Sequence, residues 1–343
     1  MIFSELTRQQ FRSFRAHRRA WLSFWILTVA FLLALGCEHL ANKRPLVVAY
    51  QSRLHFPTLR FYSDQHFGGA YQTEADYALL AESSAFKEGG GWMIYPPIPH
   101  DPFTSDWEAP GAPPHAPSLR HWLGTDSSAR DVAARLLYGF RTGMTFALAL
   151  TTSSLILGFL IGAIQGYLGG KVDLVGQRLI EIWSALPFLY VVILMGSIYG
   201  QSFWVLLLVF TLFRWIGISL YVRAEFLKLK NQTFIQAALS QGASHHRLIL
   251  RHLMPNALSP VVTLLPFGLI TAISSLTALD FLGFGMPPPS PSWGELLQQG
   301  LENLNAPWLA SSSVAALFFT LLLASFVGEG VRAAFDPRQT PSH

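Results

Sequence analysis

Long stretches without charged residues alternate with short polar segments along this chain of 343 residues. A membrane-spanning helix needs about 20 mostly apolar residues. The longest uncharged run contains a plausible turn at 196–202 (GSIYGQS) and continues, after Arg214, in apolar residues to Val222. With that run divided at the turn, the pattern predicts six transmembrane helices. The uncharged runs are 20–37, 142–170, 182–213, 253–279 and 303–328.

Composition supports the same interpretation. The chain is 51% hydrophobic and only 13% charged, about half the charge of a typical soluble domain. We therefore expect an all-α membrane protein with six transmembrane helices. Its net charge of +4 comes mainly from short flanking segments, so nucleic acid is not an expected partner, whereas membrane lipid is.

Lysine and arginine in short loops indicate the orientation, because they favour the cytoplasmic side. Residues 1–19 hold five arginines, and 223–252 hold five lysines and arginines. Residues 283–308 contain Glu295 and Glu302 but no lysine or arginine. We expect both termini and the segment 223–256 on the cytoplasmic side. The N-terminal arginines are Arg8, Arg12, Arg15, Arg18 and Arg19.

A soluble segment follows the first predicted helix and, by this topology, lies on the outer side. Its later part is rich in proline and glycine, which favour extended and turn backbone. We expect a mostly irregular insert, read either as a cap on the outer face or as a docking surface or substrate gate. In the following segment 121–144, Thr125 or Asp126 is expected to cap a helix along the outer interface.

Cys37 is the only cysteine, so no intrachain disulfide and no cysteine-based metal site is expected. The preceding residues LLALGC faintly resemble a lipoprotein processing site, but a leucine would be expected where Ala34 stands. The uncharged run of 20–37 is also long for a signal peptide. A retained transmembrane helix is the favoured interpretation.

Motifs of catalysis, metal binding and nucleotide binding are absent from the sequence. The segment GYLGGKVD at 166–173 lacks the first glycine and the Ser/Thr of a P-loop. No HExxH or GxSxG pattern occurs, and the adjacent His245 and His246 would point about 100° apart on a helix. We expect no catalytic residues, no metal and no bound cofactor. Asp126 and Asp131 are read as helix-capping residues rather than as an acid–base pair.

Two ionisable residues fall within or beside the predicted transmembrane helices. Arg214 lies about midway along the fourth helix and Asp280 near the outer end of the fifth. A charge in hydrocarbon is costly, and such residues commonly serve a transport path. Both are candidate pathway or gate residues, although Arg214 could also extend to the interface or pair inside the bundle. No relay of acidic groups or histidines crosses the helices, which disfavours a proton-coupled carrier.

The segment 235–256, IQAALSQGASHHRLILRHLMPN, predicts a basic helix-turn-helix between two transmembrane helices. The first helix is expected to end near Gln241, with Gly242 in the turn. The second is expected to end near Met254, where Pro255 would close it. From physical reasoning alone, this segment is either a knob for a protein partner or a helix on lipid headgroups.

The segment resembles the cytoplasmic EAA loop of permease subunits in ATP-binding-cassette importers. The alanine pair of that motif matches Ala237 and Ala238, its glycine matches Gly242, and its closing Leu-Pro matches Met254 and Pro255. WLGTD…RDVAARLLYGFR, GYLGGKVDLVGQRLIEIWSALP and LDFLGFGMPPPSPSWGELL are similar to the peptide- and nickel-type permeases, so the resemblance covers 121 to about 337. The insert, with FGGA, GWMIYPPIP and PFTSD, looks most like the second permease of the Yej-type oligopeptide importer, which admits microcin C.

This resemblance implies a type I ABC importer permease fold in a bacterial inner membrane. It implies residues 1–37 as N-terminus and first helix, 38–138 as periplasmic insert and interfacial helix, 139–331 as the permease domain with a coupling loop at 223–256, and 332–343 as a cytoplasmic tail. The implied partners are a second permease, ABC ATPase subunits carrying ATP and magnesium, and a periplasmic peptide-binding protein. The implied coupling residues are Phe234, Gln236, Ala237, Ala238, Gly242, Ala243, Arg247 and Pro255.

Three residues depart from the family pattern. Gln236 stands where the family often has glutamate, His252 where isoleucine is common, and Ala129 where glycine is usual. The first departure puts a salt bridge from that position to the ATPase in doubt. Two rivals stay open: a membrane enzyme using Asp126, Asp131 or Asp280 as its acid, and a stand-alone carrier. Neither explains the spacing of the alanines, glycine and proline in the coupling loop.

Overall fold

The computed structural model describes residues 5–51, 53–109 and 111–335, so most of the expected tail 332–343 lies outside the described residues. The chain divides into two compact units. The membrane unit comprises 1–28, 143–287 and 317–343, and the insert unit comprises 29–142 and 288–316.

Four helices are long and apolar enough to cross a membrane. The amphipathic helix α1 (Glu5–Ala16) precedes the first of them. The four are α2 (Arg18–Leu35), α5 (Val132–Leu168), α8 (Phe203–Lys230) and α14 (Pro307–Ala334). They correspond to the first, second, fourth and sixth predicted spans, so the sequence predicted these helices correctly.

The third and fifth predicted spans are bent pairs of helices. Helices α6 (Gly170–Ser184) and α7 (Phe188–Tyr199) meet at 72°. The segment from α10 (His245–Leu248) through α11 (Met254–Val262) meets α12 (Leu265–Phe281) at 53°. The described residues therefore contain four candidate spans, or up to six if each bent pair crosses once. The turn expected at 196–202 is confirmed, because α7 ends at Tyr199 and α8 begins at Phe203.

Glycines allow α5 and α8 to pack closely within the membrane unit. A Cβ at Gly158 would lie 2.6 Å from the backbone oxygen of Trp215, and one at Gly162 would lie 2.3 Å from that of Ser219. Gly166, four residues further along α5, is similarly close to Arg223 and Phe226 of α8. Small residues at this spacing are typical of helices whose backbones touch in membranes.

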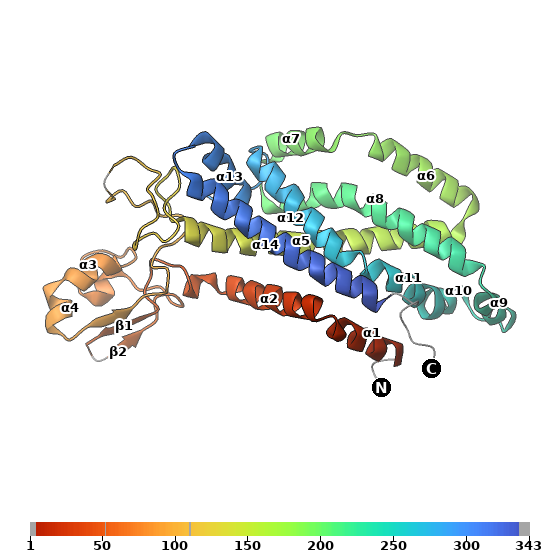
Figure 1. Ribbon diagram of the computed structural model, residues 1–343, viewed down its shortest axis with the longest axis horizontal. Helices are drawn as coiled ribbons and strands as arrows, with labels where there is room; N and C mark the ends of the chain where they lie inside the picture. The colour runs from red at the N-terminus through yellow and green to blue at the C-terminus, as the bar shows by residue number, and fades with distance from the viewer. Residues whose placement is uncertain (1–4, 52, 110, 336–343) are drawn as a thin grey trace. The chain divides into compact units, whose positions relative to one another are not determined.

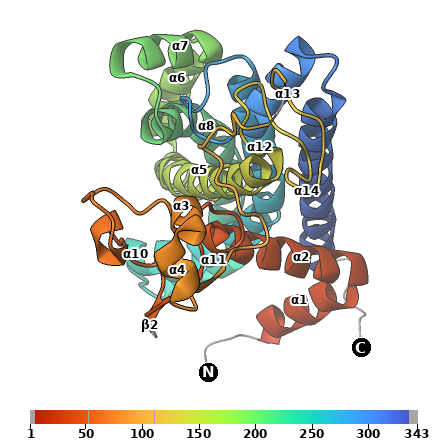
Figure 2. The same cartoon turned by 90° about the vertical axis from the view of Figure 1, so that its left-hand side faces the viewer.

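The insert unit contains a small sheet, which the sequence analysis did not expect. Strands β1 (Val47–Tyr50), β2 (Arg53–His55) and β3 (Trp92–Ile94) form an antiparallel sheet in the order β2-β1-β3. Helices α3 (Tyr77–Glu82) and α4 (Ser84–Glu88) lie beside it (Figure 1), and Figure 2 shows both helices close to β2 from a second direction. Val48, Tyr50 and Phe86 belong to its buried core. The segment was expected to be mostly irregular, and the sheet is a difference from that expectation, because strands of three and four residues are too short to show a clear alternation.

The expected interfacial helix at 121–144 is also wrong. No separate helix starts at Thr125 or Asp126; instead α5 begins at Val132 and continues for 37 residues. Asp131 caps it, since its Oδ1 accepts the backbone N–H of Ala134 at 2.7 Å. The later part of 121–144 thus belongs to the first turns of α5, a candidate span. Short 3₁₀ helices at Cys37–His39 and Asp64–Phe67, and helix α13 (Trp293–Glu302), complete this unit.

Candidate functional site

The coupling loop extends from the end of α8 through α9 (Thr233–Ser240) and α10 (Figure 1). Helix α9 ends one residue before the expected Gln241. Gly242 has φ of +80°, and its N–H donates to the oxygen of Leu239 at 2.9 Å. This left-handed backbone conformation strains residues with a side chain, which explains the glycine in the turn.

Pro255 does not close the second helix, contrary to expectation. Residues Ile249–Leu253 form a π-helical segment, and α11 continues from Met254 to Val262 with the proline in its first turn. A proline there is tolerated because the wider preceding turn removes the need for its missing N–H. The loop is therefore continuous with the fifth predicted span.

One side of the coupling loop packs into the membrane unit. Ile235, Leu248 and Leu253 are at most 2% exposed and share a core cluster with Val222 and Phe226 of α8. Ala238 and Ala243 are half-buried against the same cluster. Because protein cores are densely packed, a force applied to the loop is transmitted to α8 with little deformation.

The other side of the loop is exposed. Phe234 is 42% exposed, and Gln236, Ala237, Gly242 and Arg247 are exposed beside or after it. The Gln236 side chain donates to the oxygen of Lys230 at 3.1 Å, so this departure from the usual glutamate stabilises the turn before α9. Pro255 is also exposed, but it lies in the first turn of α11. The residues expected to contact an ATPase thus form two sets. Ala238 and Ala243 anchor the loop on the membrane unit. The others are exposed: Phe234, Gln236, Ala237, Gly242, Arg247 and Pro255.

Polar contacts that sequence reasoning missed connect the loop to neighbouring helices. Tyr167, near the end of α5, hydrogen-bonds His245 of α10 and accepts from Lys230 Nζ at its backbone oxygen, 3.0 Å away. Arg223 of α8 pairs with Asp173 of α6, with Nη2 and Oδ2 at 2.6 Å. These partners are separated by many residues, so only the fold brings them together.

Arg214 lines a cavity of about 250 Å³ between α5, α8 and α12. Its Nη2 lies 3.5 Å from the backbone oxygen of Gly268, at the outer limit of a hydrogen bond. Asp280 lies elsewhere in the membrane unit, is 8% exposed, and accepts the backbone N–H of Met286 at 2.7 Å. That contact gives Asp280 a structural role at the end of α12. A pathway role for either residue stays a prediction.

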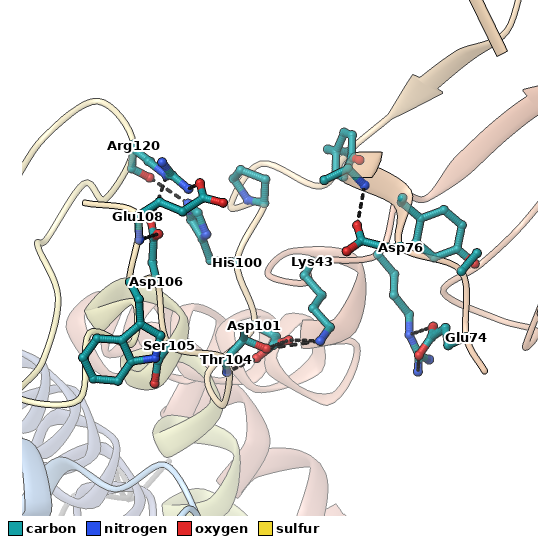
Figure 3. A pocket seen from close by; sticks show the side chains of 17 residues that line it. Lys43, Glu74, Asp76, His100, Asp101, Thr104, Ser105, Asp106, Glu108 and Arg120 are labelled. Carbon is teal, nitrogen blue, oxygen red and sulfur yellow. Dashed lines mark hydrogen bonds and ion pairs between the residues drawn. The ribbon is translucent and has the colours of Figure 1, made fainter. Parts of the chain in front are cut away.

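The insert unit holds a second, larger pocket of about 690 Å³ (Figure 3). Its charged side chains are engaged with one another: Lys43 lies 3.9 Å from Asp101, and Arg120 lies 2.8 Å from Asp106. Arg44 pairs with Glu74 in the same way. Opening this pocket to a charged ligand would require breaking existing ion pairs.

Behind this pocket, His121 lies between two carboxylates. Its Nε2 is 2.9 Å from Asp106 and its Nδ1 is 2.8 Å from Asp131. Burial raises the pKa of Asp106, but the hydrogen bonds with His121 and the Glu108 backbone, together with the charge of Arg120, lower that pKa overall. His100, His121 and Asp131 place ligand atoms within 4.8 Å of one another, a metal-like grouping that the sequence did not predict. Because both nitrogens of His121 already have carboxylate partners, this grouping is a hydrogen-bonded network.

A buried ionic network joins the start of α5 to α13. Asp126 Oδ2 lies 2.7 Å from Arg130 and 3.3 Å from Arg135, and Glu295 pairs with both arginines. Asp126 and Arg135 are fully buried. Burial lowers the pKa of Arg130, yet the hydrogen bonds and charges of Asp126 and Glu295 together raise it overall. Asp126 and Asp131 therefore serve structural roles, since paired, buried carboxylates are poor candidates for a catalytic acid.

Residues 154–341 match the family described as binding-protein-dependent transport system inner membrane component. The chain is 44% identical to the inner membrane ABC transporter permease protein YejE of Escherichia coli, over 98% of both chains. It is 41% identical to the peptidoglycan transport system permease protein YejE of Agrobacterium fabrum, over 98% of this chain and 94% of that one. It is 35% identical to the oligopeptide transport system permease protein OppC of Haemophilus influenzae, over 69% and 77%.

Among the described residues, four helices, or up to six if each bent pair is one span, are long and apolar enough to cross a membrane, as in a multi-pass membrane protein. The chain belongs to the family of inner membrane components of binding-protein-dependent transport systems. It is an ABC transporter permease subunit of the inner membrane and not itself an enzyme. The enzyme and stand-alone carrier readings of the sequence are thereby set aside. Members of this family work with an ATPase and a substrate-binding partner.

Proposed function

We propose that this chain forms half of the pathway by which an ATP-driven importer carries oligopeptides, including microcin C-like peptides, into the cell. Support comes from the two relatives that are named for peptidoglycan and for oligopeptide transport. It also comes from the 44% identity to the Escherichia coli permease YejE over 98% of both chains. The single observation that carries a coupled transport role is the coupling loop. One of its sides is exposed, and the other is packed onto α8.

In this mechanism, the exposed set around Phe234, Ala237 and Gly242 seats in a groove of the ATPase. When two ATPase subunits close on ATP, the contact moves the loop, and Ile235 and Leu248 transmit the movement to α8. A ligand shifts such an equilibrium only as far as it prefers one state over the other. ATP therefore favours one of the two states of the pathway, open to the inside or to the outside. It does so because the closed pair of ATPase subunits binds the coupling loop better in the position that the loop has in that state.

The proposal also includes a topology and a set of partners. Each bent helix pair crosses the membrane once, giving the six helices of a type I importer permease with both termini in the cytoplasm and the insert in the periplasm. A second permease supplies the other half of the pathway, and a periplasmic peptide-binding protein delivers the cargo. ATP and magnesium bind to the ATPase, and this chain holds no cofactor.

The first experiment is recovery of a tagged chain from its native membrane, with crosslinking, followed by identification of its partners. The variant Gly242→Pro should lose the ATPase, because proline fixes φ near −65° and has no N–H for Leu239. Gly90→Pro is the matched control. Gly90 is a left-handed glycine of the insert unit whose N–H also closes a turn, 3.2 Å from the oxygen of Lys87.

We expect the wild type and Gly90→Pro to recover an ABC ATPase and a second permease, and Gly242→Pro to insert normally but recover no ATPase. ATP-driven peptide uptake should follow the same order. Recovery of the ATPase by Gly242→Pro, with normal uptake, would contradict the coupling role. Uptake by wild type that survives ATP depletion while an ion gradient remains would favour a carrier.

A further inference from the structure

The cavity around Arg214 contains polar groups that have no partner in the protein. Among the described residues, Arg214 makes no ion pair, and its only hydrogen bond is the long one to Gly268. Ser154 is 1% exposed and Thr151 9% exposed, and neither hydroxyl oxygen has a hydrogen-bond partner. All three side chains line the same cavity. A buried polar group without a partner costs about 1–3 kcal/mol, so two such hydroxyl groups beside an arginine with one long hydrogen bond require an explanation.

Stabilisation of the fold does not supply that explanation. Arg214 lies near the middle of α8, where a charge in hydrocarbon is costly, and a single carbonyl 3.5 Å away does not neutralise it. The other arginine of α8, Arg223, pairs with Asp173 instead. The chain thus pairs one of these two arginines and leaves the other facing a cavity.

We propose that this cavity is a carboxylate-binding subsite in which Arg214, Ser154 and Thr151 hold a carboxylate group of the cargo during transport. A guanidinium binds a carboxylate through two parallel hydrogen bonds, and hydroxyl groups donate further ones. The peptide source of that carboxylate rests on the proposed function. The volume of about 250 Å³ fits the end of a peptide and not a whole oligopeptide.

The backbone around the cavity is consistent with an open binding space. Gly217 of α8 lines it, and a Cβ built there would meet no atom within 4 Å. Gly268 of α12 brings that helix within van der Waals reach of Thr151, since a Cβ there would lie 3.2 Å from its methyl group. Residues of α5, α8, α11 and α12 therefore line one mostly apolar cavity, into which a few polar groups face. A carboxylate held there would connect α8, which anchors the coupling loop, to the helices on either side.

The test compares ATP-driven uptake of trialanine with uptake of its C-terminal amide by the complete importer in vesicles. In wild type the free acid should be preferred. Arg214→Gln should lower uptake of trialanine about tenfold and change uptake of the amide less than about twofold, because only the acid uses the guanidinium. Arg214→Lys keeps the charge but not the planar guanidinium group, so its uptake of trialanine should lie between that of wild type and that of Arg214→Gln. Ser154→Ala combined with Thr151→Val should reduce acid uptake without abolishing it.

An equal loss of both peptides in Arg214→Gln would overturn the subsite and make Arg214 a structural residue. A second readout separates the subsite from the peptide proposal: thermal unfolding of the purified complex in sodium acetate and in sodium chloride. Acetate should raise the Tm of wild type more than chloride does, and this difference should vanish in Arg214→Gln. If wild type transports neither peptide, the oligopeptide cargo is wrong, and the acetate result alone decides the subsite. Equal acetate effects in wild type and variant would refute it.

Discussion

Arg223 of α8 and Asp173 of α6 form a bidentate ion pair in which Nη2 and Oδ2 are 2.6 Å apart. The arginine is the first residue of the predicted coupling loop, 223–256, and stands seven residues before the end of α8. The pair therefore connects the base of the loop to a helix of the bent α6–α7 pair. Because its side chains are only 26% and 14% exposed, water screens it less than a surface pair.

Asp173→Asn should weaken the link between ATP hydrolysis and transport. Loss of a charge-assisted pair should cost about 1.5–3 kcal/mol of stability, and import should fall more than ATP hydrolysis does. The control is Glu181→Gln on the same helix, whose partner Arg178 is 77% exposed, and it should behave like wild type. Both activities are measured on the reconstituted importer. Restored import in Asp173→Arg with Arg223→Asp would confirm that the charge pair matters, whereas no recovery would indicate another role for Asp173.

The glycines of α5 should differ sharply in their tolerance of alanine. Alanine favours an isolated helix by about 1 kcal/mol over glycine, so Gly143→Ala, where a Cβ meets nothing within 4 Å, should be neutral or stabilising. Gly162→Ala should be destabilising by about 1–3 kcal/mol, because its Cβ would press on the backbone of Ser219. Thermal unfolding of the two purified variants checks this, and similar Tm values would refute the close contact of α5 and α8.

The insert unit should lose stability as the pH falls below neutral. Burial and the neighbouring His121 lower the pKa of His100 from its usual 6.5, although Asp131 and the Arg120 carbonyl act in the opposite direction. Burial and His66 lower the pKa of His55 as well. A histidine whose pKa is lowered in the folded state binds protons more readily in the unfolded state. Its contribution to the stability of the fold is therefore present above about pH 6.5 and is lost as the pH falls toward the folded-state pKa.

Tm measured at about pH 7.5 and about pH 5.5 tests this sign. His100→Gln should reduce the drop in Tm between the two conditions, since glutamine does not titrate. His39→Gln, at an exposed position, is the matched control and should leave the drop unchanged. An equal or larger drop in His100→Gln would show that protonation of His100 does not destabilise the folded protein.

The sequence predicted those features that depend on neighbouring residues. Uncharged runs located the helices, and Gly242 located the turn, because hydropathy and the left-handed preference of glycine act locally. The sequence misplaced Pro255 as a helix end, since a π-helical turn before it compensates for the missing N–H. The partners of Arg135 and Arg223 were invisible, because Glu295 and Asp173 are separated from them by 160 and 50 residues. The carboxyl groups that neutralise these arginines are determined by the packing of distant segments.

Substitution of Glu295 measures how much such a distant ion pair contributes to the stability of the insert unit. It accepts hydrogen bonds from Arg130 and Arg135, and the latter is fully buried. Glu295→Gln would leave two guanidinium groups with Asp126 as their shared carboxylate, so we expect a loss of about 3–5 kcal/mol. Glu302→Gln, on the exposed face of the same helix, should change stability by less than about 0.5 kcal/mol.

Limited proteolysis and thermal unfolding of the purified complex distinguish these variants. Glu295→Gln should expose cleavage sites within 38–131 at temperatures where Glu302→Gln stays intact. Glu295→Asp keeps the charge on a shorter side chain, so its unfolding temperature should lie between those of Glu295→Gln and Glu302→Gln. If Glu295→Gln and Glu302→Gln unfold together, the buried arginines are adequately neutralised by Asp126 and the oxygen of Pro102, which accepts from Arg135 at 3.2 Å. The ionic network would then position α13 without contributing measurably to stability.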